Sequence, residues 1–512
     1  MRYLFFLVFV FNWILLFAKN PDSEETSIVI PRKVDPPFIS GQTKWADSVF
    51  NTLTLKQKIG QLFMVAAFSN KDQQHVDQIL KYIREYQIGG LIFFQGGPIR
   101  EARLTNLFQS KSNIPLLIGI DGEWGLGMRL DSTVSFPRQM AIAATGDKGF
   151  MYELGCNIAL QCKRMGIHIN FAPVVDVNSN AQNPVIHTRS FGEDPEAVTE
   201  YALAYMLGLQ DNGILATAKH FPGHGNTNAD SHFTLPTVMS GKNEFKKTEL
   251  YPFQKLIQAG VGGVMVAHLS VPFLDTTSKL PSSLSSLVID SLLVGEMGFK
   301  GLVFTDAMNM KGVSEFFKPG EAEIKAILAG NDILLYPRDV DAAVKAVENA
   351  VIKGKIPIEL INKKAYKILL AKQWAGLDSL KQVNVERLLE DLNTPYSGIL
   401  KKRAIENSIT LLRNELSLLP LGNLHQNRIA SVAFGVKEVN GFQKQLQFFS
   451  DVDAYVLPYQ FEMENFDSLL NVFKAYHTVI FSFHGLNNKP AEAFGLSAQA
   501  IKIGRASCRE RV

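Results

Sequence analysis

The sequence predicts an α/β fold, a (β/α)8 barrel of the TIM type, from three observations. Short apolar runs alternate with amphipathic segments from about residue 45 onward, which is typical of repeated βα units and a parallel sheet. Eight such runs can be counted before the pattern changes near residue 340. Acidic, basic or His residues follow five consecutive runs, as expected where chemistry lies at the C-terminal mouth of a barrel.

The eight apolar runs are the segments that we expect to form the strands. They lie near residues 62–67, 88–94, 115–120, 168–174, 214–218, 261–267, 301–304 and 332–336. Eight parallel strands with intervening helices close into a barrel. A helix-rich stretch follows at 340–377, then a polar segment at 378–400, and a new pattern of apolar runs begins near residue 404.

Length, charge and cysteine content limit the class of protein. A chain of 512 residues exceeds what one core usually supports, so we expect two domains. The net charge of +3 gives no argument for a nucleic acid or an anionic membrane, and a small neutral partner is expected. Cys156 and Cys162 lie on different faces of one expected helix, which favours neither a disulfide nor a metal pair.

The N-terminal segment, residues 1–18, fits an export signal. It has one early Arg, an apolar core and a small residue at its end, and it is shorter than the roughly 20 apolar residues of a membrane span. Leu16 is large for a cleavage site, so an uncleaved anchor is the alternative. Residues 19–44 carry four Pro and predict an extended leader. We therefore expect a periplasmic or secreted bacterial protein without stable membrane insertion.

Residues 503–512 break the preceding pattern and resemble the translation of a common sequencing-adapter oligonucleotide. We treat them, with Cys508, as an artefact and leave them out of fold reasoning. We expect the natural protein to be longer.

The segment KHFPGHGNTNADSH, from Lys219 to His232, follows the fifth apolar run and is rich in Gly and Asn. Asp230 and His232 are two residues apart, so the carboxylate can hold one imidazole nitrogen while the other faces a substrate. Such a pair makes His a usable proton donor and acceptor near neutral pH. A single His here would be a loop residue with a satisfied hydrogen bond. Three His, one Lys and one Asp together favour a site, with Lys219 and His220 donating hydrogen bonds.

Charged and His residues end the strands on either side of this segment. Strands three to seven are followed by Asp121, Asp176, Lys219 with His220, His268 and Asp306. Strand ends reach the surface in any α/β protein, so some of these residues could be polar for that reason alone. Five consecutive ends are better explained by a single site at the mouth of the barrel.

The segment from Lys219 to His232 resembles the signature of glycoside hydrolase family 3, specifically its β-N-acetylglucosaminidase branch. In that branch a loop Asp-His pair replaces the usual carboxylic acid as general acid/base. The segments VFTDAMNM, IDGEWGLGMRL, HTRSFGEDP and NFAPVVDVN also resemble motifs of the family. The resemblance covers about residues 45–490 and is strongest from 115 to 310.

The resemblance implies a role for each candidate residue. Asp306 would be the nucleophile, with a helix cap as the alternative reading, and Asp230 and His232 would be the acid/base pair. The residues expected to bind the sugar or lie close to it are Asp121, Arg129, Arg189, Lys219, His220, Asp176 and His268, the last of which could equally be structural.

Three neighbouring residues are not assigned to catalysis. For two of them a role in shaping the loop is expected or left open, and the third differs from the residue usual in the family. Glu123 is expected to serve loop architecture, and His224 either shapes the loop or touches substrate. Trp124 stands where a small residue is usual, which would change the width of a subsite.

The resemblance also divides the chain. It implies a catalytic barrel at 45–377, a linker at 378–400 and part of an α/β sandwich domain at 401–502. Family relatives often have an irregular early strand, so one departure from a regular barrel is left open.

The implied function is a retaining exo-β-N-acetylglucosaminidase that needs no metal or organic cofactor. Its expected substrates are peptidoglycan fragments first and chitooligosaccharides second. The alternatives are a β-glucosidase, a GlcNAc phosphorylase, which a His acid/base would favour by repelling phosphate less, and a non-catalytic glycan-binding protein. The oligomeric state is left open.

Overall fold

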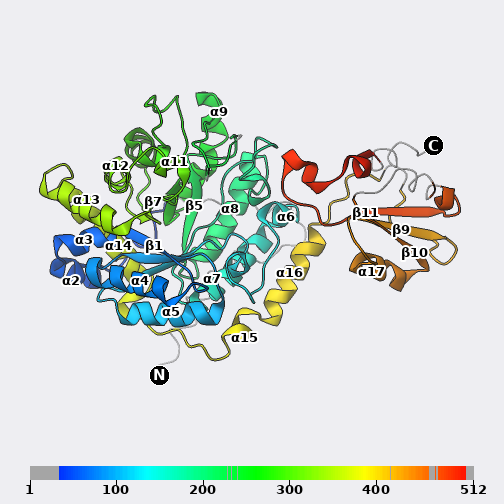
Figure 1. Cartoon of the computed structure of the whole chain (residues 1–512), viewed down its shortest axis with the longest axis horizontal. Coiled ribbons are helices and arrows are strands. Elements are labelled where there is room, and N and C mark those ends of the chain that lie inside the picture. The colour runs from blue at the N-terminus through cyan, green and yellow to red at the C-terminus, as the bar shows by residue number, and fades with distance from the viewer. Residues whose placement is uncertain are drawn as a thin grey trace, which may run out of the picture.

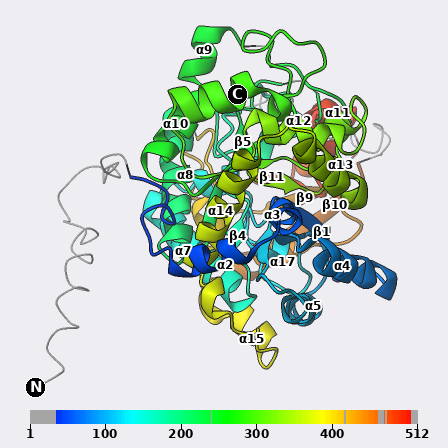
Figure 2. The same cartoon turned by 90° about the vertical axis from the view of Figure 1, so that its left-hand side faces the viewer.

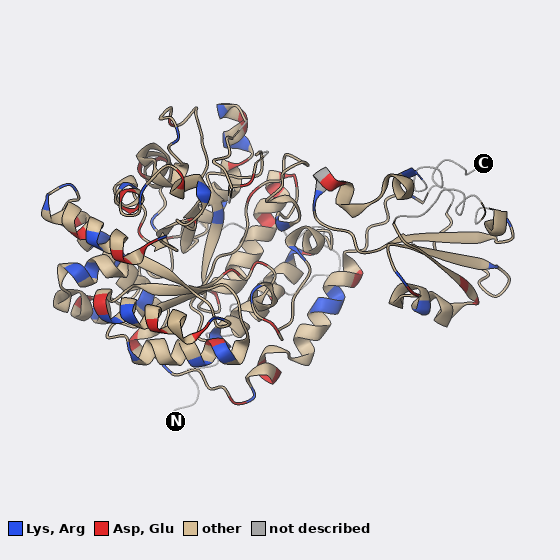
Figure 3. Cartoon of the chain, viewed as in Figure 1, with Lys and Arg blue, Asp and Glu red and all other residues tan. Residues whose placement is uncertain are grey.

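The structure, a computed structural model, describes residues 34–227, 229–231, 233–238, 240–414, 417–459, 468 and 471–502. The expected export signal and the adapter-like segment lie outside these residues. Figure 1 shows a large barrel and, beside it, a smaller unit built on a second sheet. Over the outer helices, Lys and Arg are interspersed with Asp and Glu (Figure 3), in keeping with the near-balanced charge.

The barrel has eight strands, all of which pair in parallel. They are β1 Phe63–Ala67, β2 Gly90–Phe93, β3 Leu117–Ile120, β4 Ile169–Asn170, β5 Leu215–Phe221, β6 Gly263–Val266, β7 Leu302–Thr305 and β8 Leu334–Leu335. One strand forms within or overlaps each predicted run, which confirms the (β/α)8 fold. Every strand residue is buried, as expected for parallel strands covered by helices.

The barrel closes where its last two strands meet. β1 pairs with both β2 and β8, so the first strand is regular. β7 and β8 are joined by one bridge, between Phe304 and Ile333. A hydrogen bond of 3.0 Å from the Leu335 N–H to Thr305 Oγ1 adds to this bridge.

Helices alternate with the strands and form the outer layer. They are α2 Lys44–Thr52, α3 Leu55–Gln61, α4 Gln73–Tyr86, α5 Pro98–Ser110, α6 Gln139–Ala143, α7 Lys148–Arg164, α8 Pro195–Gln210, α9 Lys242–Lys247, α10 Leu250–Gln258, a π-helix Leu287–Glu296, α11 Lys311–Ser314, α12 Glu321–Ala329, α13 Val340–Ile352 and α14 Ile358–Trp374. Asp side chains cap the N-termini of α4, α7, α8 and α13 by accepting backbone N–H groups. Helices α2, α3 and α14 lie side by side (Figure 2). Within the described residues, every helix is too short or too polar to span a bilayer.

Large side chains fill the barrel interior. The rings of Phe171 and Phe304 meet edge to face with centroids 5.3 Å apart. Gly119 makes room for Phe171, because a Cβ there would lie 2.8 Å from that ring. The interior is therefore a packed core, which leaves the strand ends as the place for a site.

The chain beyond the barrel contains more helix than the sequence suggested. Helix α15 Leu388–Leu392 and the first part of α16 Pro395–Asn407 lie in the segment 378–400 that was expected to be a polar linker. Leu388, Leu392, Leu400 and Ala404 are buried in the same apolar cluster as the barrel. Leu388 and Leu392 are four residues apart in α15, and Leu400 and Ala404 are four residues apart in α16, so each helix carries a short apolar stripe among polar residues. The division of the chain at 377 and 400 stays a prediction, and this packing argues for a later boundary.

The smaller unit is a parallel sheet with strand order β10-β9-β11. Its elements are β9 Ile429–Phe434, α17 Gly441–Phe449, β10 Val452–Leu457 and β11 Thr478–Phe483. This sheet accords with the expected incomplete α/β sandwich.

Candidate active site

A cavity of about 350 Å³ lies at the carboxyl ends of the barrel strands. Six of the ten predicted site residues line it: Asp121, Arg129, Arg189, Lys219, His220 and Asp306. Its volume lies in the range of small-molecule sites. A larger cavity of about 770 Å³ lies at the amino ends of β4 and β5 and contains none of the predicted residues. In barrel enzymes that face serves stability, so we place the chemistry at the smaller cavity.

Five charged side chains form a ladder of ion pairs along one wall of the cavity. Lys219 Nζ lies 2.8 Å from Asp121 Oδ1 and 2.9 Å from Glu123 Oε1. Arg129 Nη2 lies 2.6 Å from the other Asp121 oxygen. Arg189 donates two hydrogen bonds to Glu123, of 3.0 and 2.7 Å. Every charge in the ladder therefore has an opposite partner, which its burial requires.

The ladder also fixes the ionisation of its carboxylates. Burial alone would raise the pKa of Asp121, but Lys219 and Arg129 outweigh it and lower the pKa to about 2. Burial opposes ionisation of Glu123 as well, yet Arg189 and Lys219 hold the pKa of Glu123 far below its ordinary value. Both carboxylates are thus ionised at neutral pH and act as fixed hydrogen-bond acceptors.

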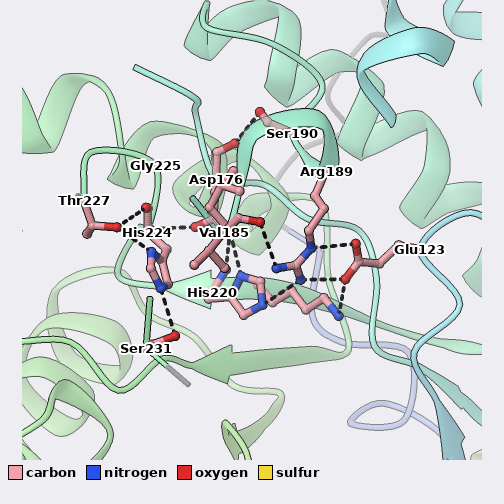
Figure 4. A network of polar contacts seen from close by, with 12 residues as sticks. Glu123, Asp176, Val185, Arg189, Ser190, His220, His224, Gly225, Thr227 and Ser231 are labelled. Atoms are coloured by element: carbon pink, nitrogen blue, oxygen red, sulfur yellow. Dashed lines mark hydrogen bonds and ion pairs between the residues drawn. The ribbon is translucent and has the colours of Figure 1, made fainter. Parts of the chain in front are cut away.

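A second network begins at Asp176, which is fully buried behind the cavity. Its carboxylate accepts from His220 Nδ1 at 2.7 Å and from the His224 backbone N–H at 2.7 Å. His220 Nε2 faces Arg189 Nη2 at 3.3 Å, and because Arg189 can only donate, this nitrogen accepts. Figure 4 shows how these contacts connect Asp176 to Arg189 and Glu123. Asp176 thus orients His220 instead of lining the cavity itself.

Asp306 follows β7 directly and lines the cavity. Its backbone N–H donates to Val266 O at 2.9 Å, and its Oδ1 accepts the Ala307 N–H at 2.8 Å. His268 lies next to this segment and is fully buried, with Nε2 3.1 Å from Ala307 O and Nδ1 2.6 Å from Ser283 Oγ. His268 therefore supports the segment after Asp306, which favours the structural alternative over direct sugar contact.

The segment after Gly225 carries the predicted acid/base pair. His232 lies outside the described residues. Asp230 is described, and its backbone carbonyl accepts the N–H groups of Phe233 at 3.1 Å and Thr234 at 3.0 Å. Ser231, the residue between Asp230 and His232, lines the same cavity as Asp306.

Several lining residues were not predicted as part of the site. Glu123 was given to loop architecture, but it holds both Arg189 and Lys219 at the cavity wall. Phe94 follows β2 and Tyr336 follows β8, but both are aromatic and end predicted apolar runs, so a rule based on charged and His residues after the runs missed them. Trp124, which we expected to change the width of a subsite, does line the cavity, and the Arg138 guanidinium lies 4.6 Å from the centre of its ring.

Comparisons of this chain with family models, curated proteins and solved structures all point to the same family. The model of the glycosyl hydrolase family 3 N terminal domain matches residues 54–371, more than half of the 512-residue chain. Beta-hexosaminidase A of Pseudoalteromonas piscicida is 38% identical over 283 residues, which are 51% of this chain and 47% of that protein. The match thus spans about half the length of that relative.

Two further proteins are similar over more of their own length. Beta-hexosaminidase LpqI of Mycobacterium tuberculosis is 32% identical over 334 residues, which are 62% of this chain and 83% of that protein. The solved structure of a glycoside hydrolase family 3 beta-N-acetylglucosaminidase from Paenibacillus has 33% sequence identity and a TM-score of 0.71. It covers 84% of this chain and 85% of the Paenibacillus chain.

Proposed function

Because the chain belongs to glycoside hydrolase family 3, we propose that it is a retaining exo-β-N-acetylglucosaminidase that hydrolyses terminal β-linked GlcNAc. One observation carries the proposal. Asp306 and Ser231 line one cavity, so the expected nucleophile and the segment of the expected proton donor converge on the same space. The relatives are named as beta-hexosaminidases and as a beta-N-acetylglucosaminidase, and these names support GlcNAc as the sugar that is released.

The proposed reaction has two steps. The Asp306 carboxylate attacks the anomeric carbon while His232, oriented by Asp230, protonates the leaving oxygen, which gives a covalent glycosyl-enzyme. His232 then takes a proton from water, which attacks the same carbon and releases the sugar with its β configuration retained. The position of Asp306 directly after a buried strand supports this role, because the barrel fixes it.

The ion-pair ladder supplies the groups proposed to bind the sugar ring. Asp121 and Glu123 are ionised acceptors, and Lys219 and Arg189 are donors held in place by them. Arg129 also lines the cavity, and because its guanidinium can only donate, we include it among the donors for ring hydroxyls. Positive and negative charges are matched around the cavity, which suits a neutral polyol better than an anion.

We propose peptidoglycan fragments as the natural substrates, and chitooligosaccharides as the second choice. The expected export signal supports this choice, because an exported enzyme would meet cell-wall glycans outside the cytosol. Both substrates end in a neutral β-linked GlcNAc, which matches the charge balance of the cavity.

Paired p-nitrophenyl β-GlcNAc and p-nitrophenyl β-glucoside test the proposal. We expect kcat/KM for the GlcNAc substrate to be higher, and to be lost in His232→Ala. A preference for the glucoside would identify a β-glucosidase. Turnover that depends on added phosphate would identify a phosphorylase. Binding of GlcNAc without turnover of either substrate would identify a glycan-binding protein.

A further inference from the structure

The imidazole of His224 lies between the strand-end network and the segment of the expected proton donor. Its side chain is buried, with Nδ1 2.8 Å from Thr227 Oγ1 and Nε2 3.0 Å from Ser231 Oγ. Its backbone N–H donates to Asp176 at 2.7 Å. Figure 4 shows His224 bridging from Asp176 to Ser231.

One assignment of hydrogens satisfies both ring nitrogens of His224. We assign the Thr227 hydroxyl hydrogen to the His224 carbonyl at 3.1 Å, so that Thr227 Oγ1 accepts from Nδ1 and the ring proton lies on Nδ1. Nε2 is then an acceptor, and the Ser231 hydroxyl donates to it. Burial lowers the pKa of His224 to about 4 despite the Asp176 carboxylate, so the ring is neutral at pH 7 and keeps this acceptor.

The chain around His224 is itself held firmly. Asn183 is fully buried and donates to the carbonyls of His224 at 2.8 Å and Gly225 at 3.0 Å. Gly225 packs so closely that a Cβ there would lie 1.6 Å from Val177 O. The backbone at His224 is therefore held in place, whereas Ser231 lies seven residues further along a Gly- and Asn-rich loop.

We propose that His224 is a positioning residue for proton transfer, and that it acts by holding Ser231 between Asp230 and His232. The proposal rests on the proposed function. Ser231 is one peptide bond from each member of the acid/base pair, so fixing its side chain limits how far that pair moves from the cavity. His224 itself moves no proton to the substrate, because both ring nitrogens are bonded to the protein.

Two substrates that differ only in the leaving group test this role. The phenolate of phenyl β-GlcNAc needs a proton on its oxygen in order to leave. The 2,4-dinitrophenolate of 2,4-dinitrophenyl β-GlcNAc leaves without one. The measured quantity is kcat/KM, which reports formation of the glycosyl-enzyme and not its later hydrolysis. We expect Ser231→Ala to lower kcat/KM for the phenyl substrate by about tenfold and for the dinitrophenyl substrate by less than about twofold.

Three further variants complete the experiment. Ser231→Thr keeps the hydroxyl and should recover kcat/KM for the phenyl substrate. His224→Gln should repeat the selective loss of Ser231→Ala, and thermal unfolding checks that it folds. Ser179→Ala, at an exposed Ser in a neighbouring loop, is the matched control and should leave both substrates unchanged.

Equal losses on both substrates would overturn the proposal, because they would indicate general damage to the site. An unchanged kcat/KM of Ser231→Ala for phenyl β-GlcNAc would overturn the proposal as well. If the wild-type enzyme prefers glucosides, the proposed function fails, and the paired phenyl and dinitrophenyl glucosides then test His224 separately.

Discussion

Lys219 Nζ lies 2.8 Å from Asp121 Oδ1, and only 2% of the Lys219 side chain is exposed. Removing this ammonium would leave the buried carboxylates of Asp121 and Glu123 short of a partner. Loss of one partner of a buried ion pair costs about 3–5 kcal/mol. We therefore expect Lys219→Met to lower the free energy of unfolding at pH 7 by that amount, measured with a chemical denaturant.

The control for this prediction is an ion pair at the surface with the same distance between nitrogen and oxygen. Lys81 lies 2.8 Å from Asp341, with side-chain exposures of 37% and 29%. Exposed pairs contribute about 0–1 kcal/mol, so Lys81→Met should change stability little. A similar loss in both variants would contradict the special role of the buried ladder.

Asp306 combines its proposed role as nucleophile with a structural hydrogen bond, and substitution can separate the two. Its Oδ1 accepts the Ala307 N–H at 2.8 Å, which an Asn side chain can also do. A neutral amide is not a nucleophile, so Asp306→Asn should lower kcat at least about 10³-fold while keeping the melting temperature of the wild type. Asp306→Ala should lose activity as well and accept azide as a substitute nucleophile, giving the α-glycosyl azide. An active Asp306→Asn enzyme would leave the hydrogen bond to the Ala307 N–H as the function of this residue.

The barrel could be predicted from the sequence because the pattern of an apolar run followed by an amphipathic segment occurs eight times. The strands are short, and β4 and β8 are only two residues long, yet each belongs to a longer apolar run. The linker was the weak point, since Leu388 and Leu392 form part of an apolar stripe too short to stand out from its polar neighbours. Helix boundaries of this kind are decided by packing against the barrel, which a single sequence does not display.

The sequence identified the residue types of the site better than their contacts. Asp121, Lys219 and Asp306 could be placed at the cavity because strand ends meet there. The pairing of Lys219 with both Asp121 and Glu123 could not, because it depends on the three-dimensional register of β5 against the loop after β3. The contact between Ser231 and His224 could not be predicted either, since the two residues are seven positions apart along an irregular loop.

Glu101 makes the stability of the barrel depend on pH. It is fully buried in the first turn of α5, and neither carboxylate oxygen has a hydrogen-bond partner among the described residues. Burial raises its pKa to about 8, whereas its ordinary value is 4.5. The folded protein therefore keeps this proton longer than the unfolded chain does. Stability from this group is complete below pH 4.5 and is lost as the pH rises to about 8.

Replacing Glu101 with Gln removes this titration. The stability of Glu101→Gln relative to the wild type should rise between pH 5 and 8 by up to about 1.4 kcal/mol for each pH unit. Denaturant unfolding at several pH values measures the difference. Glu200→Gln, at a partly exposed ion pair with Lys148, is the control and should show no such trend. A constant difference across this range would mean that Glu101 is ionised in the folded protein.

Gly312 brings the expected nucleophile and the acid/base segment together. It lies in α11, just after Asp306, and a Cβ there would lie 3.0 Å from Thr234 O and 3.3 Å from Ser231 O. Gly312→Ala should push this segment away by a few tenths of an ångström and lower kcat about tenfold with little change in melting temperature. Gly241→Ala is the matched control, because no atom lies within 4 Å of its Cβ. Equal activity in the two variants would show that the contact does not set the catalytic geometry.

The buried stripe of α15 and α16 predicts where the catalytic barrel ends. Leu388, Leu392 and Leu400 are at most 1% exposed, and the Arg403 guanidinium lies 2.7 Å from Glu153 in α7. Each buried Leu contributes about 1.5–3 kcal/mol relative to exposure, offset in part by the entropy of ordering this segment, so a chain ending at residue 377 should be less stable than one ending at 408 by about 1.5–3 kcal/mol. Thermal unfolding and gel filtration of the two shortened chains measure this. If both unfold at the same temperature, α15 and α16 belong to the following unit, and the boundary lies near 377 as the sequence first indicated.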